Sequence, residues 1–298
     1  MHRSEPPLDL DRTLAPFVRG SGDPTSRGDH RDWWFAWTTP EGSVTLRLVG
    51  EGGTVRATAW GPGQEWVLER VPDMLGARDD PSGFVPHHDL VARVWPELSR
   101  WRVPANGLVA QMLVCSVLEQ KVTGREAFAG YRRLVRAHGR PAPGPGADLG
   151  LTAPPTPREW ALIPSWEWLR AGVDSGRSRT AVAAMRVAGR LDECADLPLP
   201  QAHSRLRALP GVGEWTAAEV AQRALGDADA VSFGDYHVAR DVTRALTGEE
   251  GDDELMARLL EPYAGQRFRA QRVITLGARQ RPRRGPRRAL PTHLPRPF

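Results

Sequence analysis

The stretch Leu209-Pro-Gly-Val-Gly-Glu-Trp-Thr-Ala217 decides the fold of this 298-residue chain, together with Val231-Ser-Phe-Gly-Asp235-Tyr-His237 downstream. Pro210 and Gly211 are expected to end one helix. Gly211 and Gly213 allow positive φ and a close approach of the backbone. A second helix is predicted over residues 216–225, because small apolar residues recur there on one face. The stretch is therefore predicted to be a hairpin between two helices.

The start of the second helix is a candidate anion site. Its peptide N–H groups face the glycine-rich turn, and unpaired donors together with the helix dipole attract negative charge. A DNA phosphate suits such a site, because backbone donors carry no information about base sequence. A bare Gly-x-Gly would usually be an ordinary tight turn. Leu-Pro-Gly-Val-Gly followed by Glu-Trp-Thr-Ala is much more specific.

Asp235 is the candidate chemical group. It follows an apolar stretch and is expected to open the next helix, whose inner face Val238, Val242 and Ala245 continue. A carboxylate in a first helical turn is favoured by the helix dipole. Taken alone, Asp235 is best explained as a helix cap. The hairpin just upstream favours a catalytic acid coupled to a DNA-binding element.

These residues resemble the helix-hairpin-helix DNA glycosylase superfamily, which is marked by a Gly/Pro-rich hairpin followed by a catalytic Asp. The closer resemblance is to the 3-methyladenine DNA glycosylase II branch, in which the motif is similar and the Asp precedes a Tyr, as Asp235 precedes Tyr236. Leu118-Glu-Gln-Lys-Val-Thr123 matches the family's glutamine-containing helix before the hairpin. The resemblance covers about residues 85–278 well and the N-terminal part weakly.

The predicted fold class is α+β, with a small N-terminal antiparallel sheet domain followed by all-α helix-hairpin-helix domains that flank a cleft. Alternating patterns and turn residues predict strands at 33–38, 43–49, 54–60 and 65–68. Helices are expected at 89–95, 106–118, 126–138, 157–161, 166–171, 178–190, 197–209, 252–260 and 267–276, with a proline-rich surface loop over 141–157. The expected boundaries are 1–88 for the N-terminal domain, 89–278 for the helical region and 279–298 for a disordered Arg/Pro-rich tail.

Composition narrows the class of protein. Hydrophobic residues make up 40% of the chain and charged residues 26%, as in soluble globular proteins. Cys115 and Cys194 supply neither a disulfide framework nor a zinc site, and they exclude the four-cysteine iron–sulfur loop of endonuclease III relatives. A hydrophobic signal core and a membrane-length apolar run are both missing. The expectation is a cytoplasmic, nucleoid-associated monomer.

The net charge of +4 is unevenly distributed. Residues 279–298 contain seven arginines and no acid, so removing them leaves −3 for residues 1–278. This tail either adds non-specific phosphate contacts or is merely solvated. Lys121 is the only lysine among 40 basic residues, which suggests that a compact ammonium group is needed there.

The resemblance assigns roles to individual residues. Asp235 becomes the catalytic carboxylate, which stabilises an oxocarbenium-like sugar or orients a water. The DNA-binding set comprises Gln120, Lys121, Gly211, Val212, Gly213 and Thr216, and the base pocket comprises Trp215, Glu219 and Tyr236. The backbone carbonyls of Arg207, Leu209 and Val212 match those that bind a monovalent cation, Na⁺ or K⁺, in family hairpins. No other cofactor is expected.

Three positions depart from the family pattern. Trp215 occupies the place of the Schiff-base lysine of bifunctional relatives, which implies a monofunctional enzyme. Lys121 aligns with the wedge position, where many relatives carry Gln, Asn or Leu. It is a wedge, a contact to a phosphate or the abasic sugar, or a lyase nucleophile. Glu219 lies where the branch often has an aromatic residue, and it faces either the pocket or solvent.

The leading hypothesis is a monofunctional DNA glycosylase of base excision repair, which flips damaged purines of the 3-methyladenine or 7-methylguanine type out of double-stranded DNA and hydrolyses their N-glycosidic bond. The alternative is a non-catalytic helix-hairpin-helix DNA-binding protein, which has no need of Asp235. A nuclease or RNA-binding role has no metal-ligating or RNA-specific support. A metal site at His87, His88 and Asp89 is a weaker explanation of those residues than a solvated loop.

Overall fold

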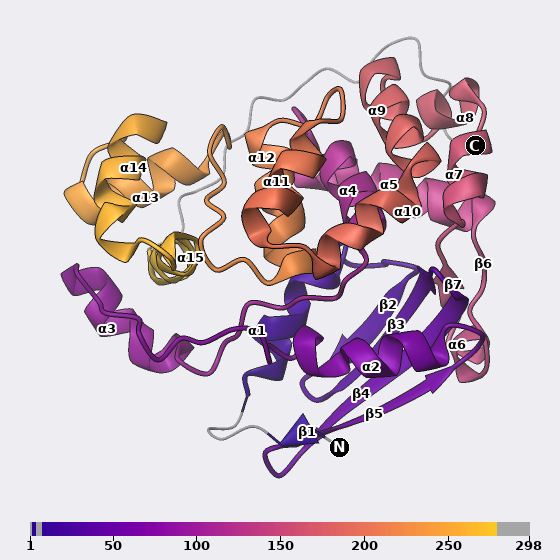
Figure 1. Ribbon diagram of the computed structural model, residues 1–298, viewed down its shortest axis with the longest axis horizontal. Coiled ribbons are helices and arrows are strands. Elements are labelled where there is room, and N and C mark those ends of the chain that lie inside the picture. Colours follow the sequence, from indigo (N-terminus) through magenta and orange to yellow (C-terminus); the bar gives the residue numbers. More distant parts are fainter. Residues whose placement is uncertain (1, 4–7, 279–298) are drawn as a thin grey trace.

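The computed structural model describes residues 2–3 and 8–278, so the predicted disordered tail at 279–298 lies outside the described residues. The N-terminal part contains an antiparallel sheet with the strand order β1-β5-β4-β3-β2 (Figure 1). Its strands are β1 (His2–Arg3), β2 (Ser26–Asp29), β3 (Asp32–Thr39), β4 (Gly42–Glu51) and β5 (Thr54–Trp60). The predicted strands at 33–38, 43–49 and 54–60 are confirmed, and β1 and β2 are two further strands that were not predicted.

The fourth predicted strand, at 65–68, is wrong. These residues belong to helix α2 (Gln64–Met74), which packs on β4 and β5. Trp66, Val67, Val71 and Met74 are its buried residues, and this spacing places them on one helical face. Four residues were too short a window to separate alternation from helical periodicity.

Every predicted helix has a counterpart with shifted ends, although the one expected at 178–190 is divided at Val187 into two helices. Helices dominate the rest of the chain. They are α1 (Leu10–Leu14), α3 (Asp89–Leu98), α4 (Val109–Glu119), α5 (Gly124–His138), α6 (Pro145–Asp148), α7 (Pro157–Leu162), α8 (Ser165–Arg170), α9 (Ser175–Arg186), α10 (Ala188–Asp192), α11 (Leu199–Arg207), α12 (Glu214–Val220), α13 (Val238–Thr247), α14 (Asp253–Leu260) and α15 (Arg267–Gly277). The α+β fold class is thereby confirmed. Among the described residues, every helix is too short or too polar to cross a bilayer.

The proline-rich segment 141–157 is more than a surface loop. It holds a short strand pair, β6 (Arg140–Pro141) with β7 (Thr152–Ala153), and the single-turn helix α6. Buried Ala142, Leu151 and Ala153 pack there against Ala36 of the sheet. The prolines fix the local backbone while the alanines and leucine between them supply the buried surface.

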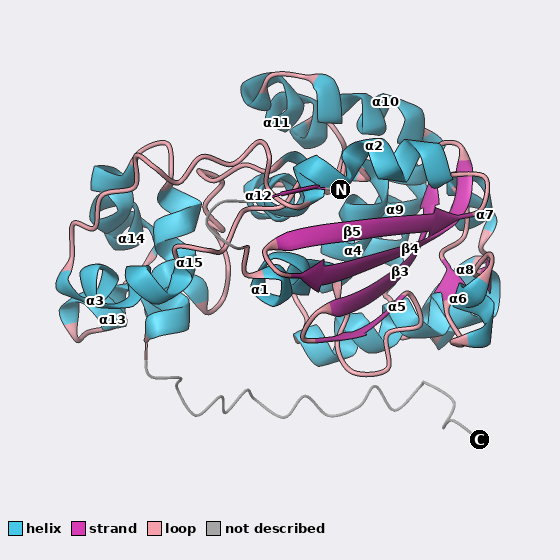
Figure 2. Ribbon diagram, turned by 90° about the horizontal axis from the view of Figure 1, so that it is seen from below, coloured by secondary structure: helices cyan, strands magenta, loops and turns pink. Residues whose placement is uncertain are grey.

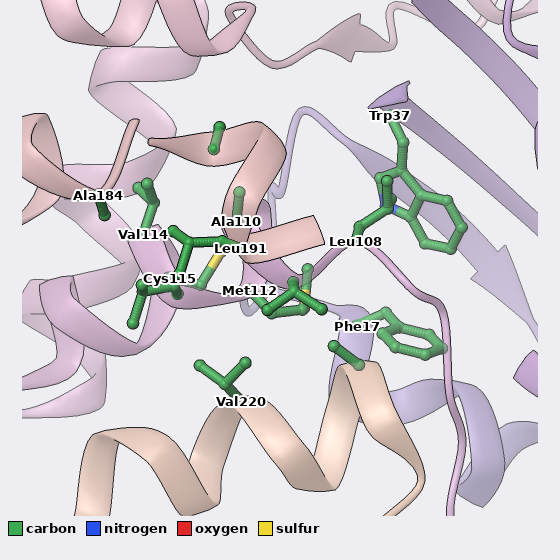
Figure 3. Close-up of a cluster of buried hydrophobic side chains, with 14 of the residues drawn as sticks. Phe17, Trp37, Leu108, Ala110, Met112, Val114, Cys115, Ala184, Leu191 and Val220 are labelled. Atoms are coloured by element: carbon green, nitrogen blue, oxygen red, sulfur yellow. The ribbon is translucent and has the colours of Figure 1, made fainter. Parts of the chain in front are cut away.

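One apolar core runs from the sheet to the hairpin helices. Trp37 of β3 and Phe17 lie beside Met112 of the central helix α4, and Val220 of α12 faces the same cluster (Figure 3). The rings of Phe17 and Trp37 meet edge to face, with centroids 5.6 Å apart. This continuous packing fixes α12 relative to α4, and therefore sets the position of the turn before α12.

A second core joins α3 to the last three helices. Val91 and Leu98 of α3 pack with α13, α14 and α15, and α3 and α15 are in direct contact. Figures 1 and 2 both show this group at one end of the molecule, with α11 and α12 between it and the group formed by α5 and α7–α9. The segment that carries Asp235 runs between α12 and this second core.

Asp192 links α10 to the start of α4. Its carboxylate accepts the peptide N–H of Ala110 at 2.9 Å. Burial raises the pKa of this carboxyl to about 6. Between its ordinary pKa and about 6, the folded protein holds a proton that the unfolded chain has released. The stability that this proton contributes is therefore lost as the pH rises through that window.

We therefore expect Asp192→Asn to gain stability relative to wild type as the pH rises from about 4.5 to about 7.5, because Asn keeps an acceptor for Ala110 but never ionises. Urea unfolding at the two pH values measures this difference. Asp196→Asn, at an exposed site nearby, is the control. A difference between Asp192→Asn and wild type that does not change with pH would contradict the prediction.

Candidate active site

The predicted hairpin is present between α11 and α12. Gly211 has φ +86°, and the N–H of Val212 donates to the carbonyl of Leu209 at 3.0 Å. The side chain of Val212 is buried in the main core and anchors the turn. The second helix begins two residues earlier than predicted, at Glu214, and continues as a π-helical turn over Ala221–Leu225.

The two hairpin glycines serve different purposes. A Cβ on Gly211 would collide with the hydroxyl of Thr180, and its φ lies in the left-handed region. Gly213 has φ −93°, so it does not use the positive φ that a glycine allows. A Cβ on Gly213 would meet no atom within 4 Å. Its missing side chain therefore leaves open space at the start of α12, where a phosphate would approach.

These geometries predict that alanine at Gly211 affects mainly stability, whereas alanine at Gly213 affects mainly DNA binding. Gly211→Ala should lower the free energy of unfolding by about 1–3 kcal/mol, through backbone strain and the Thr180 clash. Gly213→Ala should change it by less than about 1 kcal/mol, the scale of an N-cap substitution, but should weaken binding to duplex DNA. Urea unfolding and fluorescence anisotropy separate the two effects. Wild-type DNA affinity for Gly213→Ala would contradict a phosphate contact at this turn.

Asp235 lies beside the hairpin helix. The indole N–H of Trp215 donates to its Oδ2 at 3.1 Å, and the peptide N–H groups of His237 and Val238 donate to its Oδ1 at 2.8 and 3.0 Å. Helix α13 starts at Val238, so the prediction that Asp235 opens this helix is wrong. His237 is the N-cap, and Asp235 accepts the first N–H groups from outside the helix. Three donors thus fix the orientation of the carboxylate.

The predicted base-pocket aromatics differ in exposure. Trp215 is half-buried against Asp235, whereas the ring of Tyr236 is 63% exposed. The guanidinium of Arg240 lies over the Tyr236 ring, 4.8 Å from its centroid, and the His237 ring meets Tyr236 edge to face. A planar aromatic surface backed by a cation is therefore exposed next to Asp235.

Glu219 lies in the interior, with only 8% of its surface exposed. One carboxylate oxygen accepts the hydroxyl of Ser232 at 2.7 Å, and the other pairs with Arg223 at 2.7 Å. The alternative in which Glu219 faces solvent is wrong. Both oxygens are engaged by the protein itself, one helical turn beyond Trp215 on α12.

The block at the end of α4 contacts the hairpin directly. The side-chain amide of Gln120 donates to the carbonyl of Gly211 at 2.9 Å and to the hydroxyl of Thr216 at 2.8 Å. Thr216 is buried. These two side chains hold α4 against the turn, and their contact with DNA stays a prediction.

Lys121 is exposed and follows Gln120 with φ +56°. Left-handed backbone costs a non-glycine residue roughly 1–2 kcal/mol, and such strain clusters at functional sites. Two residues later, Thr123 begins α5 with a capping box closed by Glu126. The loop is thus fixed on both sides, by Gln120 and by Thr123, and it presents Lys121 outward beside the hairpin.

The carbonyls of Arg207, Leu209 and Val212 belong to the same turn. Arg207 ends α11, so its carbonyl is one of those that lack a partner within the helix. The Leu209 carbonyl accepts the Val212 N–H and keeps a second lone pair. Neutral carbonyls at a helix C-terminus suit a monovalent cation, so this donor set fits the predicted Na⁺ or K⁺.

The described part of the chain holds no cluster of three or more His, Cys, Asp or Glu side chains that could bind a metal ion. His88 hydrogen-bonds the hydroxyl of Tyr263 through Nδ1 at 2.8 Å.

The sequence did not point to Ser232, Gln222 and Gln271, which hold the segment before Asp235. A lone serine within the apolar run Ala230-Val-Ser-Phe233 was the available signal.

No protein-family model matches the chain. The probable bifunctional transcriptional activator/DNA repair enzyme AlkA of Mycobacterium tuberculosis is 35% identical over 136 residues. The match covers 45% of this chain and 27% of that protein, so the chain spans about a quarter of the length of the curated relatives it matches.

Two solved structures share the fold over most of their length. The 3-methyladenine DNA-glycosylase from Archaeoglobus fulgidus superposes with a TM-score of 0.73 at 17% identity, covering 90% of this chain and 94% of that one. The 8-oxoguanine glycosylase/lyase of Clostridium acetobutylicum, solved with double-stranded DNA, gives 0.67 at 11% identity, with 90% of each chain covered. The chain therefore has the fold of these two glycosylase structures, and over 136 residues it is similar in sequence to an AlkA protein.

Proposed function

We propose that the protein is a monofunctional DNA glycosylase of base excision repair that removes alkylated purines of the 3-methyladenine or 7-methylguanine type. The observation that carries this proposal is the Asp235 carboxylate, held by Trp215 of the hairpin helix and by two peptide N–H groups. A protein that only binds DNA has no need of an oriented acid at this place. The sequence similarity to the DNA repair enzyme AlkA supports a role in repair, and the resemblance of the hairpin motif to the 3-methyladenine DNA glycosylase II branch supports the alkylpurine class.

The proposed chemistry needs little beyond these residues. The damaged nucleotide leaves the stack, at a cost of a few kcal/mol that is lowest at a damaged pair. Cleavage of the N-glycosidic bond develops positive charge on the sugar, and the fixed Asp235 carboxylate stabilises that charge or orients the attacking water. An alkylated purine is already cationic, so its departure requires no strong general acid. The exposed Tyr236 ring can stack on such an electron-poor base.

The absence of a suitable amine supports monofunctional chemistry. Trp215 stands where bifunctional relatives carry their lysine, and Lys121 is the only lysine in the chain. Its exposed, strained position suits contact with the DNA at the lesion, as a wedge or at a phosphate. A cation bound by the carbonyls of Arg207, Leu209 and Val212 would reinforce the phosphate site of the hairpin. The substrate is duplex DNA bound by a monomer.

Base release from duplex oligonucleotides that carry 7-methylguanine or 1,N6-ethenoadenine tests the proposal. We expect abasic sites that break only after alkali treatment. Strand breaks without alkali would instead assign a lyase role to Lys121, which trapping with borohydride and Lys121→Ala would verify. No release across a panel of lesions, with DNA binding intact, would favour the non-catalytic DNA-binding protein.

A further inference from the structure

The segment that leads to Asp235 is held by a buried polar cluster centred on Ser232. The Ser232 side chain is 2% exposed, and its hydroxyl donates to Glu219 at 2.7 Å. The same hydroxyl accepts the amides of Gln222 and Gln271 at 2.9 and 3.3 Å. The Ser232 peptide N–H donates to the side-chain amide oxygen Oε1 of Gln271 at 3.0 Å. Every hydrogen-bonding group of this side chain is therefore engaged by other side chains.

The partners of Ser232 come from separate elements. Glu219 belongs to α12, Gln222 to the π-helical turn after it, and Gln271 to α15. Gln222 also donates to the carbonyl of Ala230 at 2.7 Å. Three elements thus converge on the chain three residues before Asp235. π-Helical turns are rare and are frequently found at functional sites.

Glu219 is itself held in place from the other side. Its ion pair with Arg223 is reinforced by a bond from Arg223 Nη1 to the Glu219 carbonyl at 3.0 Å. Arg223 also lies 3.6 Å from a carboxylate oxygen of Glu119, the last residue of α4. Removing one partner from such an interior arrangement leaves a charge or a donor unsatisfied.

Helix α12 therefore holds this segment at two points, one helical turn apart. Trp215 binds Asp235, and Glu219 binds Ser232. We infer that Ser232 and Glu219 are positioning residues, which set the Asp235 carboxylate against the hairpin without touching the DNA. This inference rests on the proposed glycosylase function, because it assigns their effect to the rate of base release.

The first test is Ser232→Ala in a single-turnover assay with lesion-containing duplex. The rate of base release should fall by up to about a hundredfold, the scale expected when a catalytic group moves by about an ångström, while duplex affinity stays at the wild-type value. Ser116→Ala is the matched control. Ser116 is equally buried and its hydroxyl bonds the carbonyl of Met112 within α4, away from Asp235. We expect no change in its rate.

A double-mutant cycle separates positioning from a general structural effect. If Ser232 acts through Asp235, then Ser232→Ala in an Asp235→Asn background should leave the residual rate within about twofold, since coupled residues are not additive. Equal losses in both backgrounds would overturn the inference. A wild-type rate for Ser232→Ala alone would also overturn it.

If Ser232→Ala does not fold, Glu219→Gln tests the same positioning role. Gln keeps an acceptor for the Ser232 hydroxyl but loses the charge that pairs with Arg223. Its rate should lie between those of wild type and Glu219→Ala. Equal rates for Glu219→Ala and wild type would refute a positioning role.

A spectroscopic readout keeps the inference separate from the proposed function. The indole ¹⁵N–¹H resonance of Trp215, assigned by its loss in Trp215→Phe, reports the bond to Asp235 whether or not the protein is active. We expect it to shift in Ser232→Ala and in Glu219→Gln, but not in Ser116→Ala. If the wild-type protein releases no base but the Trp215 resonance still shifts in these variants, only the glycosylase function is overturned. An unshifted resonance in both variants would overturn the positioning role.

Discussion

Asp235→Asn is expected to slow base release about a thousandfold, within the range of about 10²–10⁴ for a positioned acid or base. Asn is nearly isosteric, so the shape of the site is kept while the charge is lost. The carboxylate accepts from the protein on both oxygens. An Asn that keeps its oxygen toward the N–H groups of His237 and Val238 must point its amide at the indole N–H of Trp215. This donor–donor contact should cost about 1–3 kcal/mol of stability.

The assay should compare Asp235→Asn with Asp241→Asn under single-turnover conditions. Asp241 lies in the first turn of the same helix, α13, and its peptide N–H bonds the carbonyl of His237. Asp241→Asn removes the same charge and should retain the wild-type rate. Duplex affinity should be kept in both variants, because neither substitution removes a phosphate contact. Wild-type base release by Asp235→Asn would refute the catalytic assignment.

Much of the fold could be predicted from local pattern. Three strands and the main helices follow from periodicities that extend over seven or more residues, as in β5 and α4. The failures occur where the window was short or the chemistry ambiguous. Residues 65–68 form helix because Val71 and Met74 continue the apolar face beyond the four residues considered. The prolines of 141–157 suggested a loop, although the alanines between them pack on the sheet.

The site was predictable as a set of residues but not as a set of contacts. The hairpin motif and Asp235 could be identified along the sequence, and the structure brings Trp215 and Asp235 together. The inward orientation of Gln120 and the burial of Glu219 depend on how α4, α12 and α15 pack. Side-chain pairing across these helices is set by tertiary packing, which no local pattern encodes. For the same reason the Ser232 cluster could not be derived from sequence.

The second large effect is expected at the buried ion pair of Asp79 and Arg269. Their side chains are 2% and 0% exposed, and the guanidinium of Arg269 on α15 lies 5.8 and 5.5 Å from the ring centroids of Trp95 and Trp101. Asp79 also accepts the N–H of Val103 at 2.8 Å. Burial raises the pKa of Asp79 and lowers that of Arg269, because each charge loses solvation in the interior. The pair joins the chain after α2 to the helix that carries Gln271.

Asp79→Asn should therefore lower the free energy of unfolding by about 3–5 kcal/mol, because it leaves the Arg269 charge buried and unpaired. Asn still accepts from Val103, so the loss reports the charge rather than the shape. The double variant Asp79→Asn/Arg269→Met removes the orphaned charge and should recover much of the stability. Glu254→Ala, which breaks an exposed pair with Arg258 on α14, should cost less than about 1 kcal/mol. Urea unfolding measures all three, and a double variant less stable than Asp79→Asn would mean that Arg269 stabilises the fold through its contacts with the two tryptophans instead of through its charge.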